Sequence, residues 1–401
     1  MRTFNPVFAA PQGSPIRELF KYLSVPGMIS LAGGYPASDL FDEAGLAEAM
    51  AIAFRNPVAC LQYSSSEGLP GLRDALAHLS RQRGIPCEAD SLIVTSGSQQ
   101  GLDLLVRVLL SPGDIVLVEE PTYPATLQAL RLAQARIETV SSDQDGIDPA
   151  KLDIQLASYT QQQRPTLLYV SPTFANPTGL TLGLERRRAL LEVAARHDLL
   201  IVEDDPYGDL RFTGAAIPTL AELARMQPET QDCVVYLSSL SKIVAPGVRI
   251  GWMIGPADVL KRCTIAKQTA DLCTSGWMQA IAEAYLAQGF LERHLPVLTK
   301  AYRAKCQALV GGLQAQLGQR FECQMPAGGL FVWGRWSDGL DAKAVLEKAI
   351  EHKVLYVPGS AFYAKAPDCS AVRLSFAAPS LEGIGHAVER LAAAVRTFGY
   401  P

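Results

Sequence analysis

Residues 92–110 read LIVTSGSQQGLDLLVRVLL: a short apolar run rich in β-branched residues, a serine-glycine turn, and a helical pattern. The same alternation of strand-like and helical segments continues from about residue 91 to residue 255. It predicts an α/β fold in which a mostly parallel, seven-stranded sheet lies between helices. The expected strands are Leu92–Thr95, Ile115–Glu119, Arg136–Val140, Thr166–Ser171, Leu199–Glu203, Val234–Ser238 and Arg249–Ile254, and the expected helices include Gln99–Leu110, Ala125–Ala133 and Leu184–His197.

The pattern changes after residue 276, where long helical stretches are followed by two apolar strand pieces, Gly329–Trp333 and Val372–Phe376. This α+β character indicates a second, smaller domain. The length of 401 residues agrees, because it exceeds the size at which a single hydrophobic core stops growing. Helices are expected at 15–23, 277–288, 290–317, 342–352 and 381–397. The predicted division is an N-terminal arm in residues 1–40, a large domain in residues 41–289 and a small domain in residues 290–401.

The composition excludes several classes of protein. A net charge of −4 leaves no basic footprint for nucleic acid, and no apolar run approaches the roughly 18 residues that span a bilayer. The N-terminus lacks the apolar core of a signal peptide. Eight cysteines without a CxxC pair are typical of reduced thiols in a cytoplasmic protein, and five scattered histidines predict no metal site.

The run Ser239-Leu240-Ser241-Lys242 follows an expected strand, and Arg249 lies seven residues beyond the lysine. A lysine becomes a useful nucleophile when burial or neighbouring cations depress its pKa, and both conditions are plausible here. Most lysines are solvated, so Lys242 on its own is better explained as a surface residue.

Residues Ser96-Gly97-Ser98-Gln99 connect an expected strand to an expected helix. Backbone N–H groups, a hydroxyl and the positive end of a helix would meet there, which suits an anion such as phosphate. Arg249 and the hydroxyls of Ser239 and Ser241 could complete that site. Taken alone, these residues are better explained by a plain helix N-cap by Ser96 or Ser98.

Three further motifs lie at the ends of expected strands. Asp204 ends one of them, where a carboxylate would face the ligand crevice of an open α/β sheet, and Tyr207 follows in the same turn. Asn176-Pro177-Thr178-Gly179 forms another turn, and Tyr123 lies between two prolines. Taken singly, these are a capping acid, an ordinary Asn-Pro turn and a half-buried tyrosine.

Together these motifs supply what pyridoxal phosphate requires: an amine, an anion site, a carboxylate for the ring nitrogen, a stacking ring and donors to the phenolic oxygen. Arg373 adds an anion-binding group, because strand alternation places it opposite Val372, Leu374 and Phe376. A buried arginine needs an anionic partner, which a substrate carboxylate or a structural acid could provide.

The motifs TSGSQQ (95–100), NPTG (176–179), EDDPY (203–207) and SLSK (239–242) with Arg249 resemble the fold-type I, class I/II pyridoxal-phosphate-dependent aminotransferases, and most closely the kynurenine/2-aminoadipate aminotransferase subgroup. The resemblance runs from about Ser14 to Phe376. It implies that Lys242 forms a Schiff base with the cofactor and moves the substrate proton. It also implies that Asp204 pairs with the ring nitrogen, that Asn176 and Tyr207 bond to the phenolic oxygen, and that Tyr123 stacks on the ring. The residues that it assigns to the phosphate are Ser98, Gln99, Ser239, Ser241 and Arg249. Arg373 would bind the substrate carboxylate.

The resemblance also bears on assembly and substrate. It implies a homodimer in which Tyr63 reaches the cofactor phosphate in the neighbouring subunit. Arg17, in a helix that resembles a mobile gate, hints at acidic substrates. Tyr35, in the segment Gly33-Gly34-Tyr35-Pro36, would instead favour aromatic or bulky aliphatic ones. The resemblance also places Gly34 and Asn176 near the substrate. Pocket contacts of this kind discriminate by only ~1–3 kcal/mol, so broad specificity is expected.

The predicted function is therefore a ping-pong transfer of the amino group of an L-amino acid to a 2-oxo acid. The same cofactor chemistry leaves open β-elimination, racemisation or decarboxylation. A pyridoxal-phosphate-binding sensor is a third reading, which is disfavoured because about 90 residues precede the TSGSQQ motif and leave no room for a helix-turn-helix module. The preferred donor and acceptor, the pathway and any assembly beyond a dimer stay open.

Overall fold

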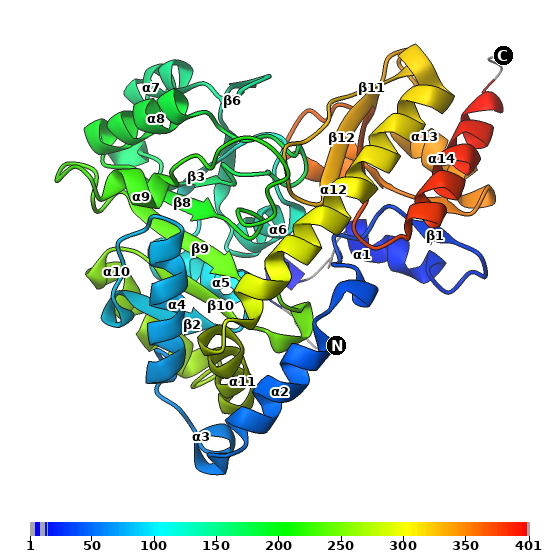
Figure 1. The fold of residues 1–401 in the computed structure, drawn as a ribbon. Helices are drawn as coiled ribbons and strands as arrows, with labels where there is room; N and C mark the ends of the chain where they lie inside the picture. The colour runs from blue at the N-terminus through cyan, green and yellow to red at the C-terminus, as the bar shows by residue number, and fades with distance from the viewer. Residues whose placement is uncertain (1–4, 9–12, 14, 399–401) are drawn as a thin grey trace.

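The computed structural model describes residues 5–8, 13 and 15–398. Its centre is a seven-stranded sheet in the order β2-β10-β9-β8-β7-β3-β4, parallel except for β10, which runs antiparallel to both of its neighbours (Figure 1). The sheet strands are β2 (Leu92–Thr95), β3 (Ile115–Val118), β4 (Arg136–Thr139), β7 (Leu167–Val170), β8 (Leu200–Asp204), β9 (Val234–Ser239) and β10 (Gly251–Ile254). All seven strands expected from the sequence are present, so the predicted fold class is confirmed.

The two faces of the sheet bury different helices because side chains alternate along each strand. One face packs against α5 (Ser98–Leu109), α6 (Pro124–Leu132) and α10 (Ala257–Ala270). The other face packs against α4 (Pro70–Gln82), α7 (Pro149–Ala157), α8 (Leu184–His197), α9 (Leu220–Ala224) and α11 (Gly276–Ala287). Helices α2 (Glu43–Ala53) and α3 (Pro57–Leu61) lie beside α11 (Figure 1).

A smaller α+β unit follows in the sequence. The 28-residue helix α12 (Phe290–Leu317) extends from beside α11 to a four-stranded sheet of order β11-β12-β15-β14, and it continues through the Gly311-Gly312 pair that left its end uncertain (Figure 1). This unit comprises β11 (Phe321–Cys323), β12 (Phe331–Trp336), α13 (Ala342–Glu351), β13 (Val354–Leu355), β14 (Val357–Pro358), β15 (Ala371–Ser375) and α14 (Leu381–Arg396).

The start of the chain attaches to this smaller unit. The expected helix at 15–23 is a single turn, α1 (Pro15–Glu18), continued by a 3₁₀ helix at Leu19–Tyr22. Strand β1 (Ile29–Ser30) then pairs in parallel with β13. The N-terminal arm is therefore held against the smaller unit, and the predicted domain boundaries remain predictions.

Three local expectations differ from the structure. The last strand of the large sheet begins at Gly251 rather than Arg249, because Arg249 has a left-handed backbone (φ 50°) that ends a short 3₁₀ helix, Pro246–Val248. The strand expected at 329–333 is shifted to β12. The hairpin of β5 (Ser142–Asp143) and β6 (Gly146–Ile147) was not predicted, since each of its strands has only two residues.

Among the described helices, none is long and apolar enough to cross a membrane.

Candidate active site

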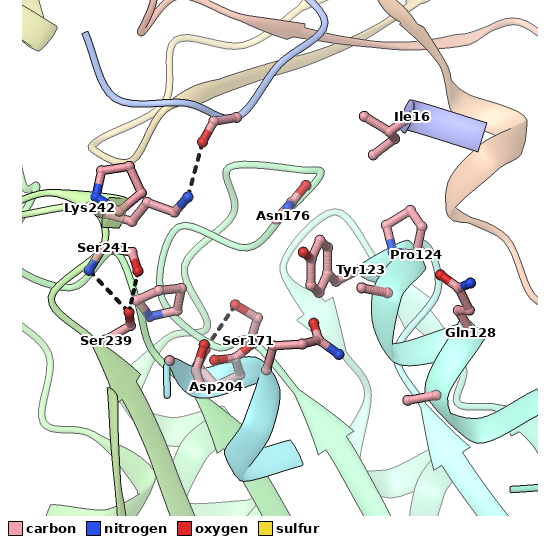
Figure 2. Close-up of a pocket in the computed structure, with 18 of the residues that line it drawn as sticks. Ile16, Tyr123, Pro124, Gln128, Ser171, Asn176, Asp204, Ser239, Ser241 and Lys242 are labelled. Carbon is pink, nitrogen blue, oxygen red and sulfur yellow. Dashed lines mark hydrogen bonds between the residues drawn. The ribbon is translucent and has the colours of Figure 1, made fainter. Parts of the chain in front are cut away.

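A cavity of about 860 Å³ lies at the carboxyl ends of β7, β8 and β9, beside the first turn of α5. Figure 2 shows Lys242, Asn176, Tyr123 and Asp204 arriving from four different segments to surround it. The structure thus brings together the predicted residues Arg17, Gly34, Tyr35, Ser98, Gln99, Tyr123, Asn176, Asp204, Tyr207, Ser239, Ser241, Lys242, Arg249 and Arg373.

Lys242 lies in the turn after β9 and points its amine into the cavity, where Nζ donates to the carbonyl oxygen of Gly34 at 3.0 Å (Figure 2). Burial, reinforced by the positive charges of Arg373 and Arg249, lowers the pKa of Lys242 from 10.5 to about 8, against the opposing effect of Asp204. A substantial fraction of the amine is therefore neutral near physiological pH, as a nucleophile or general base requires.

The expected anion corner forms where α5 begins. Gly97 caps the helix with φ 89°, and no side chain caps the first-turn N–H groups, so the serine N-cap that the sequence also allowed is not used. Arg249 lies alongside, since a Cβ built on Gly97 would come within 2.5 Å of its guanidinium nitrogen Nη2. The hydroxyls of Ser239 and Ser241 bond to each other at 2.7 Å at the same end of the cavity. These donors together fit a phosphate group.

Asp204 is the last residue of β8. Its Oδ2 accepts a hydrogen bond from the hydroxyl of Tyr169 at 2.6 Å, whereas its buried Oδ1 has no partner among the residues that the structure describes. Burial raises the pKa of Asp204 to about 6, although the Tyr169 bond opposes the shift, so the carboxylate is mainly ionised at neutral pH. A buried anion with one free oxygen calls for a cationic N–H partner.

Arg373, on β15, also lines the cavity. It donates from Nη1 to Asn176 Oδ1 at 2.8 Å and from Nη2 to the carbonyl oxygen of Ala32, and its guanidinium carbon lies 4.4 and 4.8 Å from the ring centroids of Phe331 and Phe362. Burial lowers the pKa of Arg373 to about 10, which still leaves it charged at pH 7. No carboxylate partner was found for it among the described residues, so an external carboxylate fits this need.

The mouth of the cavity is lined by the N-terminal segment. The rings of Phe20 and Tyr35 have centroids 5.6 Å apart, and Ile16 and Arg17 come from α1. The charge of Arg17 opposes the rise that burial causes in the pKa of Tyr35, which places Arg17 near that ring. Ser14, at the start of the motif that suggested a gating helix, lies outside the described residues.

Tyr63 is the one predicted site residue that does not line the cavity. It follows α3 and its side chain is 76% exposed. Its predicted role belongs to the neighbouring subunit, so its position outside this cavity neither supports nor contradicts that prediction.

Some residues of the site were not predicted from the sequence. Tyr169 could have been found, because it lies one residue before the carboxyl end of β7 and alternation places it on the same face as Ser171. Phe331 and Phe362 had no sequence signal, since only tertiary packing brings them to Arg373. Within the described ranges, no group of three or more His, Cys, Asp or Glu side chains could hold a metal ion.

These features fit pyridoxal phosphate. The free, buried Oδ1 of Asp204 suits a protonated ring nitrogen, the uncapped start of α5 with Arg249 suits a phosphate, and the neutral fraction of Lys242 suits covalent attachment. Tyr123 and Asn176 line the same cavity, where they could stack on the ring and donate to its oxygen.

Comparisons with known proteins agree with this chemistry. The chain matches the family described as aminotransferase class I and II over residues 26–391. It is 37% identical over 388 residues to aromatic-amino-acid aminotransferase 1 of Thermococcus litoralis, covering 96% of this chain and 92% of the relative. It is 38% identical over 386 residues to the 2-aminoadipate transaminase of Thermus thermophilus, covering 96% of this chain and 94% of the relative.

A solved structure is similar over nearly its whole length. The α-aminoadipate aminotransferase of Thermus thermophilus complexed with N-(5′-phosphopyridoxyl)-L-leucine superposes with a TM-score of 0.89 at 36% identity, covering 98% of this chain and 97% of that one.

The lowered pKa of Lys242 predicts how the rate of covalent cofactor attachment depends on pH. Because only the neutral amine reacts, the rate of attachment to cofactor-free protein is expected to rise from pH 7 and to level off above pH 8, the pKa of Lys242. The rate is measured from the growth of the visible absorbance band. A rate that keeps rising to pH 10 would mean that the lysine titrates near its ordinary pKa of 10.5. Lys242→Ala is the control, and it should retain no cofactor fixed by borohydride.

Proposed function

Because this chain belongs to the class I and II aminotransferases, which makes it a pyridoxal-phosphate-dependent aminotransferase, we propose that it transfers the amino group of acidic, aromatic and bulky aliphatic L-amino acids to 2-oxo acids. The single observation that carries the proposal is the grouping of Lys242, Asp204 and Arg373 around one cavity. The amine can attach the cofactor, and the free Oδ1 of Asp204 can contact the cofactor's ring nitrogen. Arg373, which has no carboxylate partner among the described residues, can bind an α-carboxylate.

The proposed assignments follow the geometry. Lys242 holds the cofactor, Asp204 contacts its ring nitrogen and Arg373 binds the substrate carboxylate. The remaining assignments are Tyr123 for stacking on the ring, Asn176 and Tyr207 for its phenolic oxygen, and Ser98, Gln99, Ser239, Ser241 and Arg249 for the phosphate. Asn176 is suited to two contacts, because its Oδ1 is engaged by Arg373 while its amide nitrogen remains able to donate.

In the mechanism, bound pyridoxal phosphate supplies an electron sink and carries the amino group between the two half-reactions. The residues of this chain orient the substrate and move its protons. Arg373 and Asn176 orient the amino acid by its carboxylate. Lys242 Nζ removes the proton from the substrate Cα, which its lowered pKa permits near pH 7. Asp204, ionised above its pKa of about 6, keeps a proton on the nitrogen that it faces.

The proposed reaction is tested by the first half-reaction alone. An L-amino acid added without a 2-oxo acid should replace the visible absorbance band of the holoenzyme with that of pyridoxamine phosphate, and a 2-oxo acid should then restore the band. Release of ammonia or carbon dioxide during turnover would instead favour elimination or decarboxylation.

Arg373→Ala is expected to raise the KM for every L-amino acid by roughly 10²-fold, because truncating one partner of a buried charge pair costs about 2–5 kcal/mol. Steady-state kinetics with several donors measure the effect. Arg335→Ala is the matched control, since Arg335 belongs to β12 of the same sheet but pairs with Glu322 at the exposed surface. An unchanged KM in Arg373→Ala would refute the carboxylate assignment.

Breadth of substrate is proposed from the mouth of the cavity. Arg17 offers a charge to an acidic side chain, and the ring pair Phe20 and Tyr35 offers an apolar surface to an aromatic one. The two named relatives act on aromatic amino acids and on 2-aminoadipate respectively, which supports the same pair of substrate classes here.

We predict that Arg17→Gln lowers kcat/KM for 2-aminoadipate and glutamate roughly tenfold, an effect of about 1.4 kcal/mol, while phenylalanine and leucine change little. Tyr35→Ala should show the opposite preference and weaken phenylalanine. Both effects are read from kcat/KM across the four donors. An equal loss for all donors in Arg17→Gln would show that Arg17 does not select the side chain.

A homodimer is proposed from the surface around α2 and α3. Met50, Phe54, Val58, Leu61 and Tyr63 are all exposed there, and Leu61 and Tyr63 are 74% and 76% exposed. Several exposed apolar side chains on neighbouring elements favour an interaction site, and a symmetric partner would bring Tyr63 to the neighbouring active site. A cytoplasmic location is proposed as well, supported by eight cysteines that are all free thiols.

Leu61→Glu is expected to convert the dimer to a monomer, because it places a charge in the apolar interface. Light scattering should give twice the chain mass of 43.2 kDa for the wild type and the single mass for the variant. Ile154→Glu is the matched control, because Ile154 is 73% exposed on α7, away from this surface, and should leave the dimer intact. A monomeric wild type would refute the shared-site proposal.

A further inference from the structure

A buried ion pair lies at the C-terminal end of α10, behind the corner assigned to the phosphate. Lys267 has a side chain with no exposed surface, and its Nζ lies 2.7 Å from Oδ1 of Asp271. Neither residue lines the active-site cavity, and no step of the reaction uses either of them. A fully buried lysine is rare and costly, so the pair calls for an explanation beyond packing.

The second oxygen of Asp271 is bonded to the segment that precedes α5. Its Oδ2 accepts from Gln100 Nε2 at 2.7 Å and from the hydroxyl of Ser96 at 3.2 Å. Gln100 Oε1 in turn accepts from the backbone N–H of Ser96 at 2.7 Å. Ser96 is therefore held through both its side chain and its backbone, and Asp271 is the common acceptor of this network.

The network continues directly to Arg249. The carbonyl oxygen of Ser96 accepts from Arg249 Nη2 at 2.7 Å, so the position of Ser96 determines where the guanidinium lies. The next residue, Gly97, has φ 89° and no room for a side chain beside Arg249. One carboxylate thus sets both the start of α5 and the arginine, the two groups proposed to bind phosphate.

We propose that Asp271, neutralised by Lys267 and linked through Gln100, is a positioning residue for the phosphate group of pyridoxal phosphate. This inference rests on the proposed assignment of Arg249 and the start of α5 to that phosphate. Asp271 acts through Ser96 and touches neither the cofactor nor the substrate. Lys267 is required because a bare carboxylate near the anion site would repel the phosphate.

Neutralisation is consistent with the electrostatics of the pair. Burial alone would raise the pKa of Asp271, but the hydrogen bonds from Lys267 and Gln100 outweigh it and lower the pKa. The carboxylate is therefore ionised at neutral pH, and the adjacent ammonium, 2.7 Å away, balances its charge.

The test compares two ligands that differ only in the phosphate. The dissociation constants of pyridoxal phosphate and of pyridoxal, which lacks the phosphate, are measured by visible absorbance on the full-length protein. Asp271→Asn and Gln100→Met should each weaken pyridoxal phosphate roughly tenfold and pyridoxal less than about twofold, as expected for the loss of one charge-assisted hydrogen bond. Gln100→Met leaves the buried ion pair intact, so it tests the proposal even if Asp271→Asn folds poorly.

Two further variants separate the possible outcomes. Asp153→Asn breaks an ion pair with Arg196 on the distant helices α7 and α8 and should change neither constant. Arg249→Ala should weaken pyridoxal phosphate selectively if the phosphate site is correctly assigned. If Arg249→Ala is selective and the Asp271 and Gln100 variants weaken both ligands equally, the network only supports the fold and the inference is wrong. If Arg249→Ala is not selective, the proposed phosphate site itself is wrong, and the inference falls with it.

Discussion

The structure depends on holding three ionisable groups in a buried cavity whose own residues do not fully neutralise or hydrogen-bond them. Lys242, Asp204 and Arg373 all have pKa values displaced by burial, to about 8, 6 and 10 respectively. The Lys242 amine can lose its proton. Among the residues that the structure describes, Asp204 Oδ1 has no hydrogen-bond partner and the Arg373 guanidinium has no carboxylate partner. A fold optimised only for stability would not hold such groups together, since unpaired buried charge is costly. In the proposed assignment, bound cofactor and substrate would supply the missing partners.

The antiparallel strand β10 makes this arrangement possible at the phosphate corner. Gly251 pairs with Thr95 on one side and with Ser239 on the other, so the segments that carry Ser98 and Ser241 lie on either side of one strand. A Cβ at Gly251 would come within 2.6 Å of the backbone of Gly97, so close packing there requires glycine. The left-handed backbone of Arg249 then turns its side chain back toward the start of α5. Residues far apart in the sequence thus come together at the proposed phosphate site.

Much of this site could be predicted from the sequence, because its residues follow strands and parallel strands present their carboxyl ends at one edge of a sheet. Lys242, Asp204, Asn176 and Tyr123 were identified in that way, and all four line the cavity. Asp271 could not be identified, since it follows a helix and its role depends on α10 packing against α5. The left-handed turn at Arg249 was likewise missed, because apolar periodicity carries no information about the sign of φ. Short strands such as β13 and β14 exist only through long-range pairing.

The two ends of the cavity are built differently. The inner end holds the groups proposed to act at the α-carbon, and the mouth is the part that the substrate side chain would meet. At the inner end, hydrogen bonds fix the groups. Asp204 on β8 is bonded to Tyr169 on β7, and Arg373, on the central strand β15 between β12 and β14, is bonded to Asn176 in the turn that follows β7. At the mouth, α1 is one turn long and Tyr35 is 44% exposed, so few contacts define the shape that a side chain meets. Rigid groups are needed where the α-carbon reacts, because small displacements of the reacting groups lower the reaction rate strongly. The reacting groups of all amino acids are alike, whereas their side chains extend toward the mouth. A fixed inner end and a loosely defined mouth therefore allow one chemistry to serve several substrates.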